Sequence, residues 1–303
     1  MKLLMNKLSE IVGLENLTEA CDMSKFTSFR AGGKADILVQ PQSVEQLKAV
    51  LQVLAAGDVP YMVMGNGSNI LVKDTGYKGV IVKLGDAFNS IDINGTVLVA
   101  GCGTLMSQVA KAALDKSLTG FEFASGIPGS LGGAVFMNAG AYKTDMGYIV
   151  ESVKVLTPDF KVIKLENKEM DFHYRTSFLQ KHRDYICLEV VLKLAVGKRE
   201  AIEEVIKERR IRREESQPLE YPSAGSVFRN PPDNFAGKLV EDCGLKGLIK
   251  GGAMISDKHA NFIINYKDAT SDDVKYLIDL AHDKVLEEYG IDLKVEQEFV
   301  NWD

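Results

Sequence analysis

Two glycine-rich segments carry the clearest chemical signal in the sequence. The first, Gly65-Asn66-Gly67-Ser68-Asn69, lies between two runs that are typical of β-strands, and the second spans residues 125–134. Glycine tolerates positive φ and leaves backbone N–H groups free to converge on an anion. We therefore predict that these segments bind a negatively charged group such as a phosphate.

The two segments differ in how well a purely structural explanation fits them. The first is not a dinucleotide-binding fingerprint, because Ile70 stands where the third glycine belongs and a strand is expected to follow. A turn between strands explains it equally well. The second holds several glycines, each costing roughly 0.5–1 kcal/mol relative to alanine in regular structure, which favours close approach of a ligand to the backbone.

Composition narrows the class of protein. The 303 residues, 46% hydrophobic and 26% charged, are typical of a globular protein of two or three domains. A net charge of −6 gives no overall attraction to nucleic acid or to anionic lipid, so neither is expected as a partner. No signal-peptide core and no apolar run of roughly 18–20 residues is found, so we expect a soluble, cytoplasmic protein. Four cysteines and four histidines lack disulfide or metal-ligand spacing, which predicts reduced thiols and no metal cofactor.

Hydrophobic periodicity predicts an α+β fold in three parts. Residues 1–84 are expected to form a small βαββ unit, whose helix begins after Ser43. Residues 85–197 are expected to form a mostly antiparallel sheet with a hairpin at Asn94-Gly95 and a helix capped by Thr104. A charged helix leads into the third part, residues 198–303, which has a long helix from Ser271 and a last strand over 291–300.

Six short motifs follow one another in the order seen in one enzyme family. They occupy residues 27–33, 65–69, 126–133, 138–142, 174–178 and 225–231. In these motifs the chain resembles the UDP-N-acetylenolpyruvoylglucosamine reductase (MurB) family, in the shorter type that lacks an extra tyrosine-loop insertion. The resemblance covers nearly the whole chain. Its middle is also similar to the wider FAD-binding fold of the vanillyl-alcohol oxidase and para-cresol methylhydroxylase type.

The resemblance implies a bound flavin. Residues 1–84 and 85–197 would be two FAD-binding subdomains, and 198–303 a C-terminal substrate-binding domain. FAD would be held without a covalent bond, since no His or Cys in these segments stands out as an anchor. The residues implied to bind it are Gly65, Asn66, Gly67, Ser68, Asn69, Gly126, Ile127, Pro128, Gly129, Ser130, Gly132, Gly133, Ala134, Asn138, Ala139 and Gly140.

The implied reaction is the NADPH-dependent reduction of the enolpyruvyl group of a UDP-sugar, a step of peptidoglycan synthesis. Such a reduction needs a donor or cation for the developing negative charge and a source for one proton. By the resemblance, Arg175 would stabilise the charge and Ser226 would donate the proton. By spacing alone, Arg175 would more often be an ion-pair residue and Ser226 a turn serine.

A glutamate near the end of the chain completes the implied catalytic set. Counting without a gap from Gly290 and Leu293 selects Glu296, whereas Glu298 requires two inserted residues. Because side chains alternate along a strand, both glutamates would lie on one face, so strand geometry leaves them unresolved. We predict Glu296 and keep Glu298 as the alternative.

Five residues near these candidates are predicted to bind the substrate: Tyr174, Arg213, Arg229, Asn230 and Lys238. One departure from the family pattern, Asn261, falls at an expected turn, where no effect on catalysis is expected. Two other functions stay open, a related flavin oxidase that passes electrons to oxygen and a flavin-binding protein without catalysis. The preference for NADPH over NADH and the oligomeric state also stay open.

Overall fold

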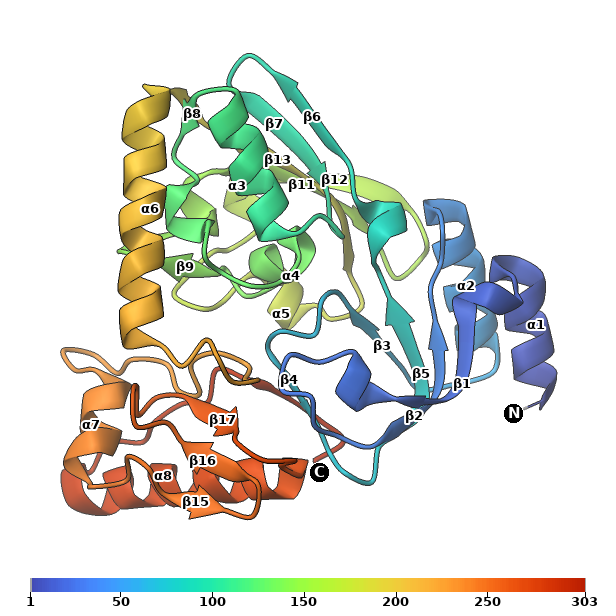
Figure 1. Cartoon of the computed structure of the whole chain (residues 1–303). Helices are drawn as coiled ribbons and strands as arrows, with labels where there is room; N and C mark the ends of the chain where they lie inside the picture. The colour runs from blue at the N-terminus through green and yellow to red at the C-terminus, as the bar shows by residue number, and fades with distance from the viewer. Residues whose placement is uncertain (1, 303) are drawn as a thin grey trace. The chain divides into compact units, whose positions relative to one another are not determined.

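The computed structural model describes residues 2–302, whose elements are shown in Figure 1. They form two compact units, each built from several stretches of the chain. Unit 1 consists of the residues up to Thr18, Ile37–Asn66 and Gly79–Ile211, and unit 2 of Glu19–Asp36, Gly67–Lys78 and the residues from Arg212 on. Three strands run from one unit into the other: β1 (Leu17–Asp22), β2 (Lys34–Val39) and β5 (Tyr77–Lys83).

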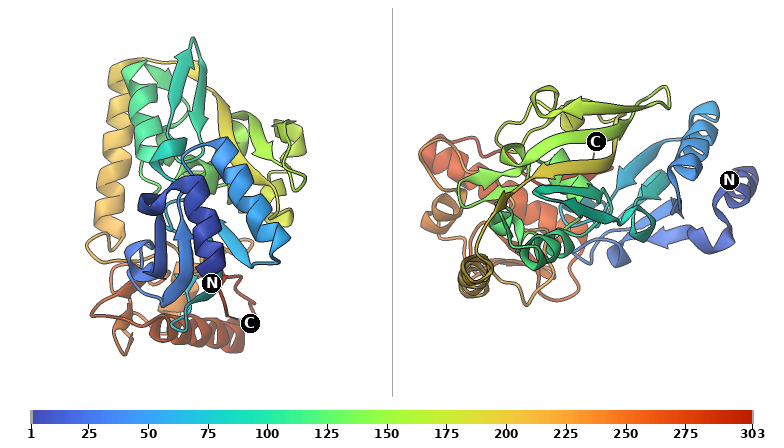
Figure 2. Two further views of the ribbon diagram at one scale, coloured as in Figure 1. Left: turned by 90° about the vertical axis from the view of Figure 1, so that its right-hand side faces the viewer. Right: turned by 90° about the horizontal axis from the view of Figure 1, so that it is seen from above.

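Two helices and a parallel strand pair form the first part of unit 1. α1 (Lys2–Val12) and α2 (Val44–Ala56) lie side by side, as Figure 2 shows. β3 (Tyr61–Met64) pairs in parallel with β5, in a sheet of order β1-β2-β5-β3. The predicted start of α2 is confirmed, because Ser43 Oγ accepts a hydrogen bond from the Gln46 N–H at 3.1 Å.

A five-stranded antiparallel sheet forms the second part of unit 1. Its strands are β6 (Ile91–Asn94), β7 (Val97–Gly101), β11 (Val150–Leu156), β12 (Val162–Glu166) and β13 (Ile186–Lys193), in the order β12-β11-β13-β7-β6. The predicted antiparallel pairing is confirmed. The hairpin at Asn94-Gly95 is also confirmed, and Gly95 has the positive φ of +60° that such a turn favours.

Helices α3 (Met106–Asp115) and α4 (Leu131–Phe136) belong to the same unit, and α4 packs against β7 and β13. The prediction that Thr104 caps α3 is wrong. Leu105 occupies the N-cap, and the Thr104 hydroxyl instead donates to the Ser90 carbonyl at 3.1 Å.

Shorter elements connect these larger ones. In unit 1 they are β8 (Leu118–Thr119), β9 (Gly140–Ala141), β10 (Thr144–Asp145), α5 (Phe178–Lys181) and β14 (Ala195–Val196). The 3₁₀ turns are η1 (Leu14–Asn16), η2 (Met23–Lys25), η3 (Asp86–Phe88), η4 (Glu122–Ala124), η5 (Met146–Tyr148) and η6 (Asn167–Glu169). The charged helix predicted from the sequence is confirmed as α6 (Arg199–Ser216).

Unit 2 is built on a small sheet and one long helix. β15 (Ile249–Lys250), β16 (Ala253–Ile255) and β17 (Ile263–Asn265) form an antiparallel sheet, and α8 (Ser271–Tyr289) packs across it (Figure 1). α7 (Ala236–Asp242) also contacts α8. The prediction of a long helix from Ser271 is confirmed. Thr270 caps this helix by accepting a hydrogen bond from the Asp273 N–H at 3.1 Å.

The predicted strand over residues 291–300 is wrong in extent. Only β18 (Glu298–Val300) is a strand, and it runs parallel to β4 (Ile70–Val72) in unit 2. Upstream, Val295 forms an isolated bridge with Phe228, and the chain bends at Gln297. The bend occurs because the chain changes its pairing partner at this point.

Each unit has its own apolar core. The core of unit 1 includes Leu47, Val82 and Leu98, and that of unit 2 includes Phe29, Leu71 and Leu277. Among residues 2–302, no helix is long and apolar enough to span a membrane. The same residues contain no cluster of three or more His, Cys, Asp or Glu that could hold a metal ion.

Candidate active site

The two predicted anion-binding segments meet within unit 1. A Cβ on Gly65 would lie 2.1 Å from Ser130 Oγ, so this close approach requires glycine. Gly129 has a φ of +120°, which side chains other than glycine rarely adopt. Within residues 2–302, the N–H groups of Gly65 and Ser130 donate no hydrogen bond. Two neighbouring segments therefore present unused backbone donors, an arrangement suited to an anion.

The second glycine segment is held against the chain that precedes α3. The Leu131 N–H donates to the Thr104 carbonyl at 2.8 Å, and the Gly132 N–H donates to the Cys102 carbonyl at 2.9 Å. A Cβ on Gly132 would lie 2.8 Å from Cys102 Cβ. Burial raises the pKa of the Cys102 thiol to about 12, so it stays protonated and unreactive at neutral pH.

Arg175 lies at the tip of a two-residue turn in unit 1. His173 and Thr176, on either side, exchange two backbone hydrogen bonds of 3.0 Å. Arg175 has a φ of +54°, a conformation that is uncommon outside glycine and asparagine and is often maintained at functional sites. Its guanidinium carbon lies 5.1 Å from the ring centroid of Tyr174, and Nη2 donates to the Gly140 carbonyl at 2.9 Å.

Two further hydrogen bonds hold this turn against the segment that follows α4. Ser177 Oγ donates to the Phe136 carbonyl at 2.7 Å, and Asn138 Nδ2 donates to the His173 carbonyl at 2.7 Å. Asn138 is buried, and its Oδ1 accepts from the Gly147 N–H at 2.9 Å. The structure thus brings Arg175 together with residues 138–140, which are among the residues implied to bind FAD.

Ser226 belongs to an extended segment of unit 2 that is paired on both sides. On one side, Ser226 forms an antiparallel bridge with Phe262. On the other side, the Glu296 N–H donates to the Val227 carbonyl at 2.7 Å. The predicted proton donor is therefore one residue away from the residue that pairs with Glu296.

Glu296 and Glu298 have different surroundings in the backbone. Glu296 pairs with the Ser226 segment, whereas the Glu298 N–H donates to the Asn69 carbonyl at 2.9 Å, at the start of β18. β18 begins only at Glu298 and the chain bends at Gln297, so the expectation that one regular strand carries both glutamates is wrong. Pairing with the Ser226 segment favours Glu296 as the proposed residue.

The first glycine segment is divided between the units, because Gly65 and Asn66 belong to unit 1 and residues 67–69 to unit 2. In unit 2, Gly67 accepts a hydrogen bond from the Ser28 N–H at 3.1 Å through its carbonyl. Asn69 Nδ2 donates to the Glu296 carbonyl at 3.0 Å. A side chain predicted to bind FAD therefore also supports the segment that carries Glu296.

The predicted substrate residues of unit 2 differ in how they are engaged. Lys238 is 67% exposed and pairs with Asp242 at 2.8 Å. Arg213 Nε donates to Gln217 Oε1 at 3.0 Å, and Asn230 Oδ1 accepts from the Ala236 N–H at 3.0 Å in the first turn of α7. Arg229 Nε is buried and has no hydrogen-bond partner among the residues described. A buried donor of this kind calls for an explanation, and an oxygen atom of a ligand would supply one.

Two protein-family models match the chain. The first, FAD binding domain, covers residues 35–166, and the second, UDP-N-acetylenolpyruvoylglucosamine reductase, C-terminal domain, covers residues 217–300. The UDP-N-acetylenolpyruvoylglucosamine reductase of Caldanaerobacter subterraneus subsp. tengcongensis is 45% identical over 99% of this chain and 98% of its own. The chain belongs to the MurB family. A relative of the same name from Clostridioides difficile is 43% identical over 98% of this chain and 97% of its own.

Solved structures agree with membership in the MurB family. The crystal structure of MurB from Thermus caldophilus matches with a TM-score of 0.80 at 36% identity, covering 94% of this chain and 98% of that one. The 4-ethylphenol oxidase of Gulosibacter chungangensis, with 16% identity and a TM-score of 0.51 over 97% of this chain and 64% of its own, shares the fold alone. The predicted α+β class is confirmed, as is the assignment to this family of flavoenzyme oxidoreductases of peptidoglycan synthesis.

The residues of unit 1 fit the FAD that membership in the MurB family implies. Unused N–H groups at Gly65 and Ser130 suit the pyrophosphate, and an added Cβ on Gly133 would meet nothing closer than Ser130 Oγ at 3.5 Å. The protonated, buried thiol of Cys102 is a poor covalent anchor. The backbone of the second glycine segment therefore leaves room for FAD, and the Cys102 thiol packed against this segment does not react with it.

Sequence reasoning missed two residues that hold this MurB-family site in place. Ser177 was part of a recognised motif without a role, yet its buried hydroxyl anchors the Arg175 turn. Asn261 was expected to lie in a turn without an effect on catalysis, and its structural role was missed, because both ends of its carboxamide bond the backbone of Phe228. The feature of the sequence that could have indicated this role is an amide residue placed between two apolar residues, Ala260 and Phe262.

Proposed function

We propose that the chain reduces the enolpyruvyl group of UDP-N-acetylglucosamine enolpyruvate to UDP-N-acetylmuramate, with NADPH as the donor. The proposal is supported by membership in the MurB family over nearly the whole chain. The observation that carries the catalytic assignment is the 2.9 Å bond between Arg175 and the carbonyl of Gly140. It ties the positive-φ turn of Arg175 to Gly140, one of the residues implied to bind FAD.

The proposed FAD-binding residues are those implied by the resemblance, in segments 65–69, 126–134 and 138–140. The neighbouring N–H groups of Gly65 and Ser130 would bond the pyrophosphate. When bound, FAD would accept hydride from NADPH and pass it to the methylene carbon of the enolpyruvyl group. The protein's own contribution is to bind, to orient and to stabilise charge.

Arg175 is proposed to stabilise the negative charge that develops beside the substrate carboxylate. A guanidinium is permanently charged and can meet a carboxylate with two parallel N–H groups. Nη2 is already directed by the Gly140 carbonyl, and the Tyr174 ring lies beside the guanidinium. The group is therefore oriented before the substrate binds, which makes electrostatic stabilisation effective.

Ser226 is proposed to donate the proton to the carbon next to the carboxylate. A hydroxyl is a weak acid, but an enolate-like carbon is a strong base, so transfer is feasible within hydrogen-bond reach. Glu296, whose N–H bonds the carbonyl of Val227, is proposed as the third catalytic group, which in its protonated form would donate a hydrogen bond to the negative charge at the reacting centre. Both residues are held by the same backbone pairing in unit 2.

The proposed substrate residues are Tyr174, Arg213, Arg229, Asn230 and Lys238. Of these, Arg229 has the strongest structural support, because its buried Nε lacks a partner among the described residues. Lys238 has the weakest support, since its ammonium already pairs with Asp242. We also propose that the reaction occurs in the cytoplasm, the compartment suited to the free thiols of Cys21, Cys102, Cys187 and Cys243.

An anaerobic absorbance experiment tests this function. The purified protein is expected to show the yellow spectrum of oxidised flavin, to bleach with NADPH, and to recover its colour when the enolpyruvyl sugar is added. Recovery only on admission of oxygen would favour the alternative, a flavin oxidase of the same fold. A protein that remains colourless after attempted reconstitution with FAD would contradict the assignment of the glycine segments.

A further inference from the structure

The side chain of Asn261 replaces a neighbouring strand for one residue of the Ser226 segment. Its Oδ1 accepts a hydrogen bond from the Phe228 N–H at 2.9 Å, and its Nδ2 donates to the Phe228 carbonyl at 2.9 Å. Both residues are buried, Asn261 at 4% and Phe228 at 2% exposure. A carboxamide has both an NH2 donor group and a carbonyl acceptor, which match the carbonyl and N–H of Phe228 opposite it.

The backbone of the same segment is bonded at almost every position. The Val227 N–H donates to the Asn261 carbonyl at 2.8 Å, and the Val227 carbonyl accepts from the Glu296 N–H at 2.7 Å. The Arg229 N–H donates to the Lys294 carbonyl at 2.8 Å. Asn261 on one side and the stretch of residues 294–296 on the other therefore clamp residues 227–229.

The turn that carries Asn261 is itself well supported. The Asn261 N–H donates to His259 Nδ1 at 3.1 Å, and the Ser256 N–H donates to the Phe262 carbonyl at 2.9 Å. Burial and the nearby Lys246 lower the pKa of His259, so its Nδ1 stays available as an acceptor. The backbone that carries the Asn261 carboxamide is therefore fixed by hydrogen bonds.

We propose that Asn261 is a positioning residue that holds Ser226 in register with Glu296. This inference rests on the proposed function, in which Ser226 donates the proton. Without the carboxamide, the buried N–H and carbonyl of Phe228 lose their partners, a costly state that a shift of the strand would relieve. Such a shift moves Ser226 relative to Glu296, and small misplacements of reacting groups have large effects on rate.

The test compares the two half-reactions in FAD-loaded, full-length variants. In Asn261→Ala, anaerobic reduction of the flavin by NADPH is expected within twofold of the parent. Reoxidation by the enolpyruvyl sugar is expected to fall about 10- to 100-fold, because the proton donor is displaced. The solvent deuterium isotope effect on reoxidation is expected to rise, as proton transfer becomes rate-limiting.

Asn265→Ala is the matched control, four residues further along the same hairpin. Asn265 Oδ1 accepts from the Ala269 N–H at 2.8 Å and Nδ2 donates to the Phe29 carbonyl at 3.0 Å, so it bridges backbone within unit 2 as Asn261 does. It has no hydrogen bond to residues 226–229 among those described. Both half-reactions are expected to stay within twofold, even if the protein melts at a lower temperature.

Asn261→Asp keeps the test decisive if Asn261→Ala folds poorly. It preserves size and the acceptor for Phe228 N–H but faces the Phe228 carbonyl with a second acceptor. A selective loss of reoxidation is expected here as well. Unchanged reoxidation in both variants, or an equal loss in both half-reactions or in Asn265→Ala, would overturn the positioning role.

The parent protein and Ser226→Ala separate this inference from the proposed function. A parent that fails to reoxidise with the enolpyruvyl sugar, or a Ser226→Ala variant that reoxidises normally, would contradict the proposed function itself. A competent parent and an impaired Ser226→Ala variant, combined with normal Asn261 variants, would contradict the positioning role alone.

Discussion

Arg175 and Ser226 are held in place by different means. Arg175 lies at the tip of a turn with positive φ and depends on side-chain anchors from Ser177, Asn138 and its own guanidinium. Ser226 lies in an extended segment whose neighbours are bonded through the backbone on both sides. A strained turn is sensitive to the loss of single anchors, whereas a paired strand is sensitive to the loss of register.

The largest expected effect is at the turn itself. Arg175→Ala removes both the proposed charge stabiliser and its bond to Gly140. Reoxidation of reduced flavin by the enolpyruvyl sugar is expected to slow about 10²- to 10³-fold, as for the loss of other preorganised donors. Stopped-flow absorbance measures this rate. Arg175→Lys, which retains charge but not the planar fork, is expected to recover part of it, and a loss below threefold in Arg175→Ala would refute the role.

Substitution of each glutamate tests which of the two acts together with the Ser226 segment. Glu296→Gln is expected to slow the same step by about 10²-fold, the lower range for a removed acid–base or charge-stabilising group. Glu298→Gln, placed at the start of β18, is expected to stay within about threefold because its backbone pairs with Asn69 rather than with the Ser226 segment. The opposite ranking of the two rates would reassign the third catalytic group.

Ser177→Ala tests whether one anchor holds the strained turn. Removing the hydroxyl leaves the Phe136 carbonyl without its donor in a partly buried site, and a loss of about 1–3 kcal/mol in the free energy of unfolding is expected. Ser9→Ala is the control, since Ser9 also donates to a backbone carbonyl, that of Asn6, but in an exposed helix. Its effect is expected within about 0.5 kcal/mol. Urea unfolding measures both, and equal losses would show that burial of the anchor is unimportant.

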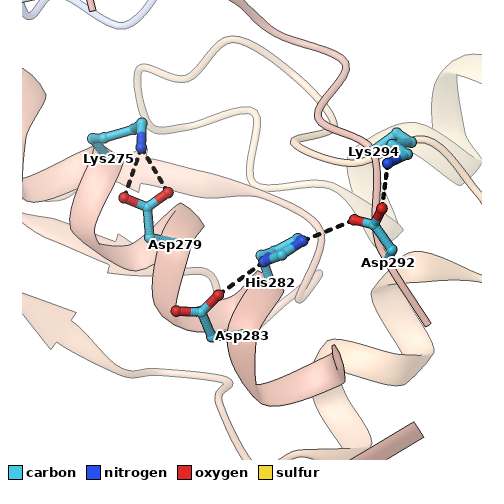
Figure 3. A network of polar contacts seen from close by, with 6 residues as sticks. All are labelled: Lys275, Asp279, His282, Asp283, Asp292 and Lys294. Atoms are coloured by element: carbon cyan, nitrogen blue, oxygen red, sulfur yellow. Dashed lines mark hydrogen bonds and ion pairs between the residues drawn. The ribbon is translucent and has the colours of Figure 1, made fainter. Parts of the chain in front are cut away.

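The smallest expected effect concerns an ion network near the segment that leads to Glu296 (Figure 3). His282 lies between Asp283 and Asp292, at 2.9 and 3.0 Å, and Lys294 also pairs with Asp292. Lys275 and Asp279, one turn earlier on α8, form their own pair. Hydrogen bonds to Asp292 and then Asp283 raise the pKa of His282 above its ordinary 6.5.

The direction in which pH changes the free energy of unfolding follows from the difference in the His282 pKa between the folded and unfolded states. Because the pKa is raised on folding, the stabilisation is complete below about pH 6.5 and is lost as the pH rises through the higher folded-state value. His282→Gln is therefore expected to lower the free energy of unfolding by at most about 1 kcal/mol at pH 5.5 and by less at pH 8.5. Urea unfolding at both pH values measures the difference, and a loss that grows with pH would contradict it.

Local elements could be predicted from the sequence because neighbouring residues determine them. Ser43 caps a helix through Gln46, three residues on, and Gly95 supplies the positive φ of a two-residue turn. The pairing of β18 with β4 could not be predicted in this way, since Glu298 and Ile70 are far apart in the chain and short strands carry little pattern. The expected strand over 291–300 failed for the same reason.

The candidate site, too, could be predicted only in part, because some of its contacts join residues that are far apart in the chain. Glycine composition favoured a binding role for residues 125–134 and left a turn as an equal explanation for residues 65–69, and the structure brings Gly65 and Ser130 together. The proposed roles of Arg175, Ser226 and Glu296 came from the resemblance to a family and stay predictions. The contributions of Ser177 and Asn261 depend on carbonyl and N–H groups that only the folded chain places opposite them.

Because stretches of the chain alternate between the two units, unit 2 is not encoded by one continuous gene fragment. A gene fragment that begins at Arg212 encodes most of unit 2, but not β4 or the apolar side chains of Phe29 and Leu71 that complete its core. Such a fragment would leave β18 without its partner strand and its core open to water. Domain exchange between homologous enzymes therefore has to transfer residues 19–36 and 67–78 along with the C-terminal stretch.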